Sequence, residues 1–329
     1  MKRKILDVKN LSTSFRNKKE SIVTVDNISF EVYEGETLGI VGESGCGKSL
    51  TSLSIMGLVK SPGEVKATSI LYDGMDLGNM SKKGFREIRG NSMSMIFQEP
   101  MTSLNPVYKI GNQIEESLKI HKKMDKAQRH TIIINLLEQV GIARAEEIAD
   151  SYPHQLSGGM RQRVMIAMAI ACQPKLIIAD EPTTALDVTI QAQILDLLKN
   201  LQIKNNMAMI LITHDLGVVS EVCERVVVMY AGKIVERGEV RSVLSNPEHP
   251  YTKGLLASLP KNAQPQSRLP YIPGQVPPPK MWGGGCRFAD RCASAFDKCR
   301  NEQPPLFTTE NQSEVACWSY EREGVVHNG

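Results

Sequence analysis

The sequence predicts an α/β fold in which a parallel sheet carries a phosphate-binding loop. An apolar run at residues 37–41 leads into a glycine-rich segment at 42–49, GESGCGKS, which matches the pattern G-x-x-x-x-G-K-S. Two further apolar runs, 176–180 and 207–213, are separated by a helical stretch, as expected of parallel strands joined by helices. A proline-rich stretch and a cysteine-rich tail then predict a smaller C-terminal extension.

Composition limits the class of protein. A chain of 329 residues exceeds one typical domain, so one large domain and a smaller one are expected. The 39 basic and 36 acidic residues give a net charge of +3, which is too balanced to favour nucleic acid as a partner. No apolar run reaches 18 residues, and the basic N-terminus lacks an apolar signal core, so we expect a cytosolic chain without a membrane span. Its seven cysteines are then expected to be reduced thiols or metal ligands.

Antiparallel strands are expected before the glycine-rich loop, and helices after it. Residues 5–8, 22–25 and 28–32 alternate between apolar and polar side chains, which predicts half-buried strands. Residues 49–57 follow the loop with a helical pattern. The chain therefore has the strand–loop–helix context that the phosphate-binding motif requires.

A helical region is expected at about 99–172. Its first two helices are marked by Ile110 and Ile132, and a third is capped by Ser157. Later in the chain, residues 226–230 and 233–236 flank Ala231-Gly232 and predict a hairpin. We expect a nucleotide-binding domain at 1–246, a proline-rich linker at 247–282, which holds nine of the 17 prolines, and a cysteine-rich extension at 283–329.

The loop residues have distinct chemical roles. Glycines at 42, 45 and 47 allow backbone N–H groups to converge on phosphate oxygens, and the following helix N-terminus adds its positive dipole end. Lys48 is expected to bridge the β- and γ-phosphates, and the Ser49 hydroxyl to ligate Mg²⁺. ATP contacts are thus expected at Gly42, Glu43, Ser44, Gly45, Cys46, Gly47, Lys48, Ser49 and Leu50.

Polar side chains that suit hydrolysis follow the other apolar strands. Asp180 ends one strand and is expected to hold Mg²⁺, whereas the adjacent Glu181 fits a general base or water-orienting role. His214 follows the strand 210–213 and is expected at the same sheet edge, near the γ-phosphate. Gln98 ends the strand 94–97.

These motifs, in this order, resemble those of ABC-transporter nucleotide-binding subunits. The resemblance covers residues 5–240 and places Walker A at 42–49, the Q-loop at Gln98, the signature from Leu156, Walker B at 176–181, the D-loop at 185–187 and the switch histidine at His214. It implies that Gln98 joins Ser49 and Asp180 as a ligand of Mg²⁺. It also implies a head-to-tail dimer in which Ser157, Gly158 and Gly159 contact the partner's ATP, with Asp187 at the interface. Phe15 occupies the place of an aromatic residue that stacks on adenine, although it equally suits a strand core.

Three longer segments narrow the resemblance to the oligopeptide and dipeptide importers: 95–106, 249–256 and 285–292. It implies an ATP-hydrolysing motor subunit at the cytoplasmic face of the cell membrane. Its implied partners are a second, homologous ATPase subunit, two transmembrane permease subunits and an extracellular peptide-binding protein. Importers of nickel or other small solutes share much of this pattern. Alternatives of another class are a soluble ABC ATPase that acts on nucleic acid or ribosomes, and a redox-sensing module.

Four cysteines of the tail form a candidate metal site: Cys286, Cys292, Cys299 and Cys317. Sets of four thiolates bind structural zinc or iron–sulfur clusters, and the spacings here lack the C-x-x-C pairs usual for zinc. The resemblance to peptide-importer ATPases implies a 4Fe–4S cluster; zinc and free thiols remain the alternatives. Cys46 lies in the phosphate loop, where its neighbours are expected to favour reactivity.

Overall fold

The computed structural model describes residues 2–16, 20–98, 103–184, 186–259 and 270–322, and the chain divides into two compact units. Unit 1 comprises Met1–Ile5, Val32–Thr37 and Asn79–Ile212; unit 2 comprises Leu6–Glu31, Leu38–Gly78 and Thr213–Gly329. Among the helices of the described residues, none is long and apolar enough to cross a membrane.

Unit 1 is built on three parallel strands. β7 (Met93–Ile96) pairs with β8 (Leu176–Asp180), and β8 pairs with β9 (Ala208–Thr213), so that Ile178 lies opposite both Met95 and Ile210. Every residue of β8 and β9 is buried, as expected of central parallel strands. The predicted apolar strands at 176–180 and 207–213 are therefore confirmed to within one residue.

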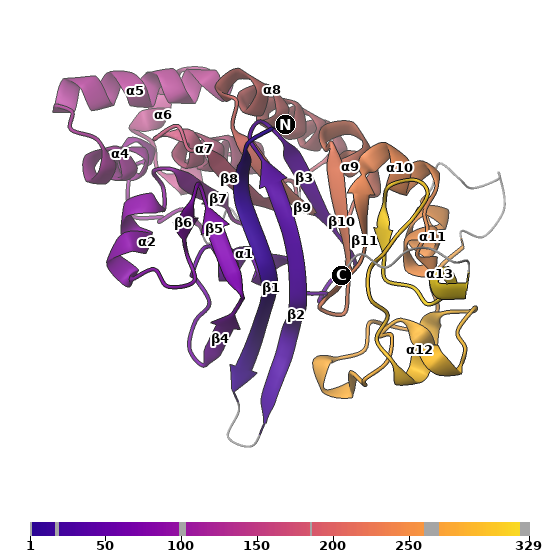
Figure 1. The fold of residues 1–329 in the computed structure, drawn as a ribbon. Coiled ribbons are helices and arrows are strands. Elements are labelled where there is room, and N and C mark those ends of the chain that lie inside the picture. Colours follow the sequence, from indigo (N-terminus) through magenta and orange to yellow (C-terminus); the bar gives the residue numbers. More distant parts are fainter. Residues whose placement is uncertain (1, 17–19, 99–102, 185, 260–269, 323–329) are drawn as a thin grey trace. The chain divides into compact units, whose positions relative to one another are not determined.

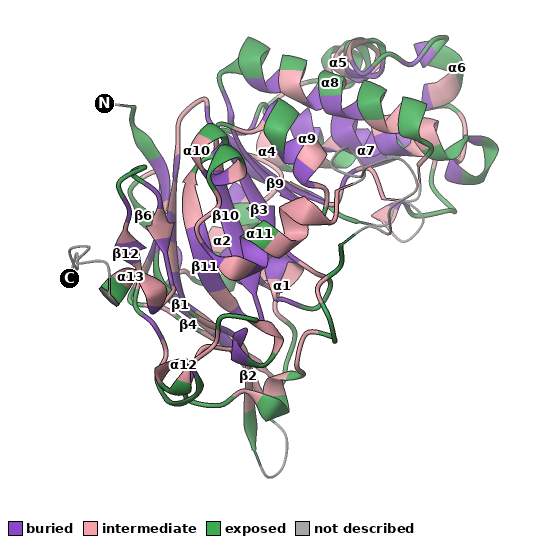
Figure 2. Cartoon of the chain, turned by 90° about the vertical axis from the view of Figure 1, so that its right-hand side faces the viewer, coloured by how far each residue is buried: buried purple, intermediate pink, exposed green. Residues whose placement is uncertain are grey.

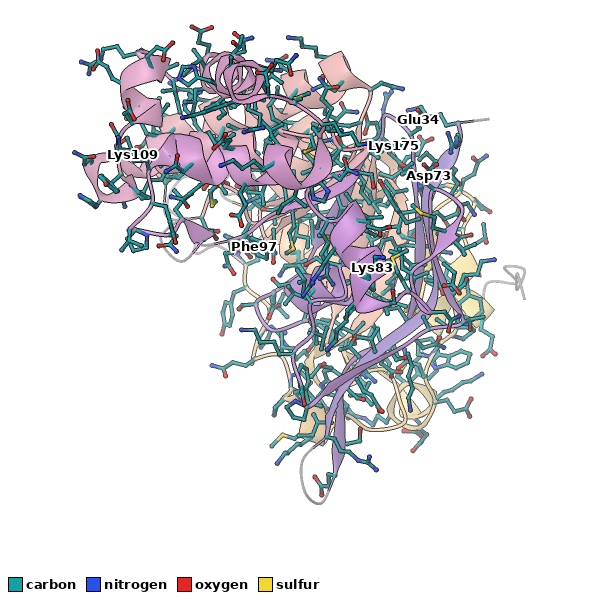
Figure 3. The ribbon with its side chains drawn as sticks, turned by 90° about the vertical axis from the view of Figure 1, so that its left-hand side faces the viewer. Glu34, Asp73, Lys83, Phe97, Lys109 and Lys175 are labelled. Carbon is teal, nitrogen blue, oxygen red and sulfur yellow. The ribbon has the colours of Figure 1, made fainter. Side chains whose placement is uncertain are left out.

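The helices of unit 1 also agree with the sequence pattern. α4 (Ile110–His121), α5 (Lys126–Gln139), α6 (Ala145–Ala149) and α7 (Gly158–Ile170) pack against one another, as Figure 1 shows. Lys109, labelled in Figure 3, precedes α4 and forms an ion pair of 2.8 Å with Asp150. α2 (Lys82–Ile88) and α8 (Val188–Asn205) complete the unit, while the short α6 was not predicted.

Unit 2 contains an antiparallel sheet from the N-terminal part of the chain. β1 (Lys4–Arg16) and β2 (Ser21–Tyr33) share this sheet with β4 (Gly63–Lys66), β5 (Ser69–Tyr72) and β6 (Met75–Asp76). β1 pairs antiparallel with both β4 and β5. The two strands expected at 22–25 and 28–32 form one continuous strand, in which Asn27 has a positive φ of 52°.

A second group of strands in unit 2 carries the phosphate loop. β3 (Thr37–Val41) is wholly buried and pairs in parallel with the largely buried β10 (Arg225–Tyr230), as Figure 2 shows. β11 (Lys233–Glu239) forms the predicted antiparallel hairpin with β10. α1 (Lys48–Ile55) follows the loop as expected, and α9 (Leu216–Val222) and α10 (Val240–Ser245) lie later in the unit.

The C-terminal segment continues this strand group. β13 (Glu314–Val315) pairs with β11 and with β12 (Phe307–Thr308), and Arg237 binds both carboxylate oxygens of Glu314. The short helices α12 (Asp297–Asn301) and α13 (Ser319–Arg322) frame a small core that includes Phe307 and Trp318. The tail is therefore held by strand pairing as well as by its own thin apolar core.

The proline-rich stretch differs from the expected irregular segment. Residues Pro250–Ala257 form the helix α11, and Tyr251 at its second position is fully buried. Its ring packs against Tyr230 and Phe288, with ring centroids 4.7 and 5.5 Å away. Pro250 at the first helical position is compatible with the helix, and aromatic packing anchors it, although the proline content alone predicts an irregular segment.

Candidate functional site

The phosphate loop of unit 2 depends on backbone conformations that favour glycine. Gly42, Gly45 and Gly47 have φ angles of 152°, 79° and 104°. A Cβ atom on Gly42 would lie 2.2 Å from the carbonyl oxygen of Met229, so the loop passes too close to β10 for any side chain at this position. The glycines therefore fix the course of the loop between β3 and α1.

Lys48 is buried and turned back onto the loop. Its ammonium group donates to the carbonyl oxygens of Gly42 and Glu43, at 2.7 and 3.1 Å. No side chain caps the N-terminus of α1, which begins at Lys48. A cation and a helix N-terminus thus meet in one loop, an arrangement that suits a polyphosphate.

Cys46 does not have the environment of a reactive thiol. It is fully buried, and burial raises the pKa of its thiol despite the nearby Lys48. A protonated, inaccessible thiol is a poor nucleophile, so the expectation of reactivity was wrong.

Unit 1 brings two predicted residues together at the ends of β7 and β8. The Gln98 amide donates to a Glu181 carboxylate oxygen at 2.8 Å, and the Thr184 hydroxyl donates to the same oxygen at 2.8 Å. Gln98 follows Phe97, which is labelled in Figure 3 and is 41% exposed. Thr184 was missed because a threonine near a strand end carries no distinctive pattern.

Asp180 and Glu181 occupy different environments, as their expected roles require. Asp180 is the last residue of β8 and is buried, whereas Glu181 is half-buried and has a positive φ of 45°. The Glu181 N–H donates to the carbonyl oxygen of Ile212 at the end of β9. The positive φ of Glu181 changes the course of the backbone after β8, so that adjacent carboxylates need not share one site.

The signature residues of unit 1 lie at the start of α7. Ser157 is its N-cap and accepts from the Met160 N–H at 3.3 Å. A Cβ on Gly159 would lie 3.0 Å from the side chain of Ile190 in α8. Asp187 caps α8 by accepting from the Ile190 N–H at 2.9 Å. The signature and the D-loop are thus packed side by side, and residue 185 of the D-loop lies outside the described residues.

The remaining predicted residues belong to unit 2. His214 is exposed directly after β9, and the neighbouring Asp215 caps α9 through the N–H groups of residues 217 and 218. Phe15 is half-buried near the end of β1, opposite Gly63. Residues 99–102 of the segment after Gln98 lie outside the described residues.

The four tail cysteines line a single cavity in unit 2, together with His249, Phe288 and Trp318. All four are free thiols, and burial raises the pKa of Cys286 to about 11, helped by the other three thiols. No group of three or more His, Cys, Asp or Glu side chains among the described residues is arranged to hold a metal ion. The cysteines are thus gathered, but not in the geometry of a single-ion site.

Comparison with known proteins shows the family of the chain. The ABC transporter family model matches residues 25–184, and a model of the C-terminal region of oligopeptide/dipeptide transporters matches residues 235–299. The oligopeptide transport ATP-binding protein AppD of Bacillus subtilis (strain 168) is 54% identical over 98% of both chains. The dipeptide transport ATP-binding protein DppD of Escherichia coli (strain K12) is 53% identical over 92% of both.

Solved structures show the same core. The dimeric, post-hydrolysis structure of the ATP-binding cassette MJ0796, bound to ADP and Pi, aligns with a TM-score of 0.65 at 28% identity, over 72% of this chain and 99% of that one. Fold, motifs and matches together define an ABC transporter ATPase. Within that class, the chain belongs to the family of ATP-binding subunits of oligopeptide and dipeptide transporters.

Proposed function

We propose that this chain is the ATP-hydrolysing motor of a peptide importer and that Glu181 is its catalytic base. The contact between Gln98 and Glu181, at 2.8 Å, is the observation that carries the catalytic assignment. This contact links the residues that follow β7 and β8, and its acceptor is the Glu181 carboxylate that the sequence pattern assigns to hydrolysis. Nearly full-length similarity to AppD and DppD supports peptides as the transported class.

The residues proposed to contact ATP have separate roles. Lys48 exchanges its bonds to the loop carbonyls for phosphate oxygens when ATP enters, because the anionic oxygens are stronger acceptors for an ammonium group. Ser49, Asp180 and Gln98 supply the oxygen ligands expected for Mg²⁺, which when bound neutralises charge on the β- and γ-phosphates.

Hydrolysis then requires a positioned water. Glu181 orients that water and accepts its proton, with Gln98 and Thr184 fixing the direction of the carboxylate. His214 contacts the γ-phosphate, and Phe15 stacks on adenine. Fixing the carboxylate before the substrate arrives lowers the cost of reaching the reactive geometry.

A second ATPase subunit completes each site. The Walker A motif lies at the start of α1, and Ser157, Gly158 and Gly159 lie at the start of α7, so the chain has two separate helix N-termini at which phosphate is favourably bound. We assign these three residues, with Asp187, to the ATP held by the partner. The dimeric state of MJ0796 supports such an arrangement. Two transmembrane permease subunits and an extracellular peptide-binding protein complete the importer, and this chain lies at the cytoplasmic face of the membrane.

The chain's organisation follows this division of labour. We propose a nucleotide-binding domain at 1–246, with its helical subdomain at about 99–172, a connecting segment at 247–282 and an extension at 283–329. The helix α11 within the connecting segment packs its Tyr251 beside Tyr230, so this segment is an anchored connection.

The extension is proposed to hold a 4Fe–4S cluster through Cys286, Cys292, Cys299 and Cys317. Four thiols line one cavity, yet no three are arranged to hold a single ion among the described residues. Each thiolate of a cluster binds its own iron, so a cluster tolerates wider spacing than zinc does, and these residues fit it better. Bound there, the cluster cross-links the thiolates and stabilises the tail.

Peptide uptake in cells tests the proposed function. Cells that lack this chain should lose uptake of labelled di- and oligopeptides and recover it with the wild-type chain, but not with Lys48→Ala. Lys66→Gln, an exposed lysine in the same unit, is the matched control and should restore uptake. Normal peptide uptake without the chain, or loss of nickel uptake instead, would contradict the proposal.

A further inference from the structure

Glu43 of the phosphate loop is held at three points. Its backbone N–H donates to the hydroxyl oxygen of Tyr251 at 2.8 Å. Its carboxylate accepts from Arg291 at 3.0 and 3.2 Å, and its carbonyl oxygen accepts from Lys48 at 3.1 Å. Two of the three contacts come from residues more than 200 positions later in the sequence, beyond the last ABC motif, and all four residues belong to unit 2.

Tyr251 is a fixed acceptor for the loop. It is fully buried, and burial raises the pKa of its hydroxyl well above the ordinary value, so the group stays neutral. The rings of Tyr230 and Phe288 hold it in place. The Glu43 N–H is part-buried, so losing this acceptor leaves it poorly paired, which carries a cost in free energy.

Arg291 is equally well fixed. Its side chain is 8% exposed, and it donates to the carbonyl oxygens of Ile272, Pro273 and Gly274 as well as to the Tyr230 hydroxyl. The ion pair with Glu43 is therefore not an ordinary surface pair, whose flexible partners contribute little. Arg291 brings a positive charge to the loop and holds it there.

The charge matters because the loop receives a polyanion. Glu43 carries a negative charge within the segment that binds phosphate, and like charges at short range oppose each other. Arg291 neutralises this charge from the side of the C-terminal extension. Together with Tyr251 it also fixes the loop backbone, so that less conformational freedom is lost when ATP binds.

We propose that Arg291 and Tyr251 are positioning residues of this subunit's own ATP site, and that the C-terminal extension thereby sets ATP affinity through Glu43. The inference rests on the proposed function of the loop. It assigns to the extension a role in nucleotide binding, in addition to any role in holding a cluster. Because Arg291 immediately precedes Cys292, the proposal predicts that a change at the cysteine site alters ATP binding at the loop.

Calorimetric titration of the purified full-length chain with Mg²⁺–ATP tests the proposal. Arg291→Gln should weaken ATP binding by about tenfold, and Tyr251→Phe, which removes only the hydroxyl, by about threefold. Arg300→Gln is the matched control, because Arg300 lies in the same extension and pairs with Asp290 at the surface. It should bind ATP like the wild type.

Two further measurements separate positioning from general destabilisation. In a Glu43→Gln background, Arg291→Gln should change affinity less than twofold, because the charge that it compensates is gone. Hydrogen exchange of the 42–46 amides should accelerate in Tyr251→Phe while exchange in β10 stays unchanged.

Three outcomes overturn the proposal. If Arg291→Gln binds ATP as tightly as Arg300→Gln while Lys48→Ala abolishes binding, the positioning role is refuted and the proposed function remains intact. An equal loss in both backgrounds shows a general structural effect and also refutes it. Unchanged binding in Lys48→Ala contradicts the proposed function of the loop, and the positioning role with it.

Discussion

Glu181 combines a strained backbone with a carboxylate fixed from two sides. Its φ of 45° is uncommon for a residue with a side chain, and its N–H continues the hydrogen-bond ladder to Ile212 of β9. Gln98 and Thr184 both donate to one oxygen of its carboxylate. A carboxylate held in this way suits the water-orienting role proposed for Glu181.

Glu181→Gln should keep ATP binding and slow hydrolysis by on the order of 10²–10⁴-fold, because an amide cannot accept the proton. Phosphate release is to be measured in the assembled complex, with the partner's own site disabled. The mutant should also accumulate closed dimers with ATP. Turnover close to the wild-type rate would assign the base to another residue.

The site residues that could be predicted from the sequence are those that belong to a local motif. Lys48 and Ser49 follow a fixed glycine spacing, and Asp180 follows an apolar strand, so their places on secondary structure could be predicted. Arg291 could not, because its contact with Glu43 joins positions distant in sequence and no spacing encodes it. Cys46 was misjudged for a related reason: its reactivity depends on burial, which its neighbours in sequence do not determine.

Among the elements, α11 begins beside a buried carboxylate that comes from another element, β11. Glu236 in β11 is fully buried and accepts from the N–H groups of Glu248 and His249, at 2.8 and 3.0 Å, just before α11 begins. These bonds satisfy backbone donors at the helix start. The proline content of the segment conceals the helix, whereas the regular apolar spacing of α4, α5 and α8 made those helices predictable.

Glu236→Gln should lower the free energy of unfolding by roughly 1–3 kcal/mol, although the two side chains have nearly the same shape. A glutamine has one acceptor oxygen, so its NH₂ group would face one of the two N–H donors. Chemical denaturation measures the change, and Glu314→Gln, a partner in a half-exposed ion pair, is the control with a smaller expected loss. Equal losses in both variants would show that the carboxylate of Glu236 is not specifically required.

The signature helix offers a test of which ATP each element serves. Ser157→Asp preserves the N-cap of α7, because aspartate caps as well as serine does, but it places a negative charge where the partner's phosphate is proposed to bind. ATP binding at this subunit's own site should remain, while dimer closure and hydrolysis fall. Lys48→Ala should instead weaken ATP binding at this subunit's own site first, before it affects closure over the partner's ATP. A solved complex with Ser157 and Lys48 of one chain on the same ATP would refute the head-to-tail arrangement.

For the molecule as a whole, the residues assigned to ATP are divided between the two compact units. Lys48, His214 and Phe15 belong to unit 2, whereas Gln98, Glu181 and the signature belong to unit 1. The order of the motifs predicted the fold and the family because each motif is local and each follows a recognisable strand or helix. The C-terminal extension was predicted less well, since strand pairing through β13 and contacts with the loop depend on the folded chain.

The cysteine cavity provides the last test, at the scale of the whole chain. Protein purified without oxygen should contain iron approaching roughly four atoms per chain if a 4Fe–4S cluster is held by four thiolates. Cys292→Ser should lose this iron and destabilise the extension, because its apolar core is small and ligation closes the long segment between Cys286 and Cys317.

Cys172→Ser provides the matched control, since Cys172 is a buried thiol in unit 1, outside the cavity. It should retain the iron of the wild type. Through Arg291, the loss of iron in Cys292→Ser should also weaken ATP binding, whereas the maximal rate of hydrolysis at saturating ATP should change little, because the cluster ligands do not belong to the proposed hydrolytic residues. One zinc per chain without iron, in protein made with ample iron, would exclude the cluster, and four alkylatable thiols in the metal-free native protein would exclude both metals.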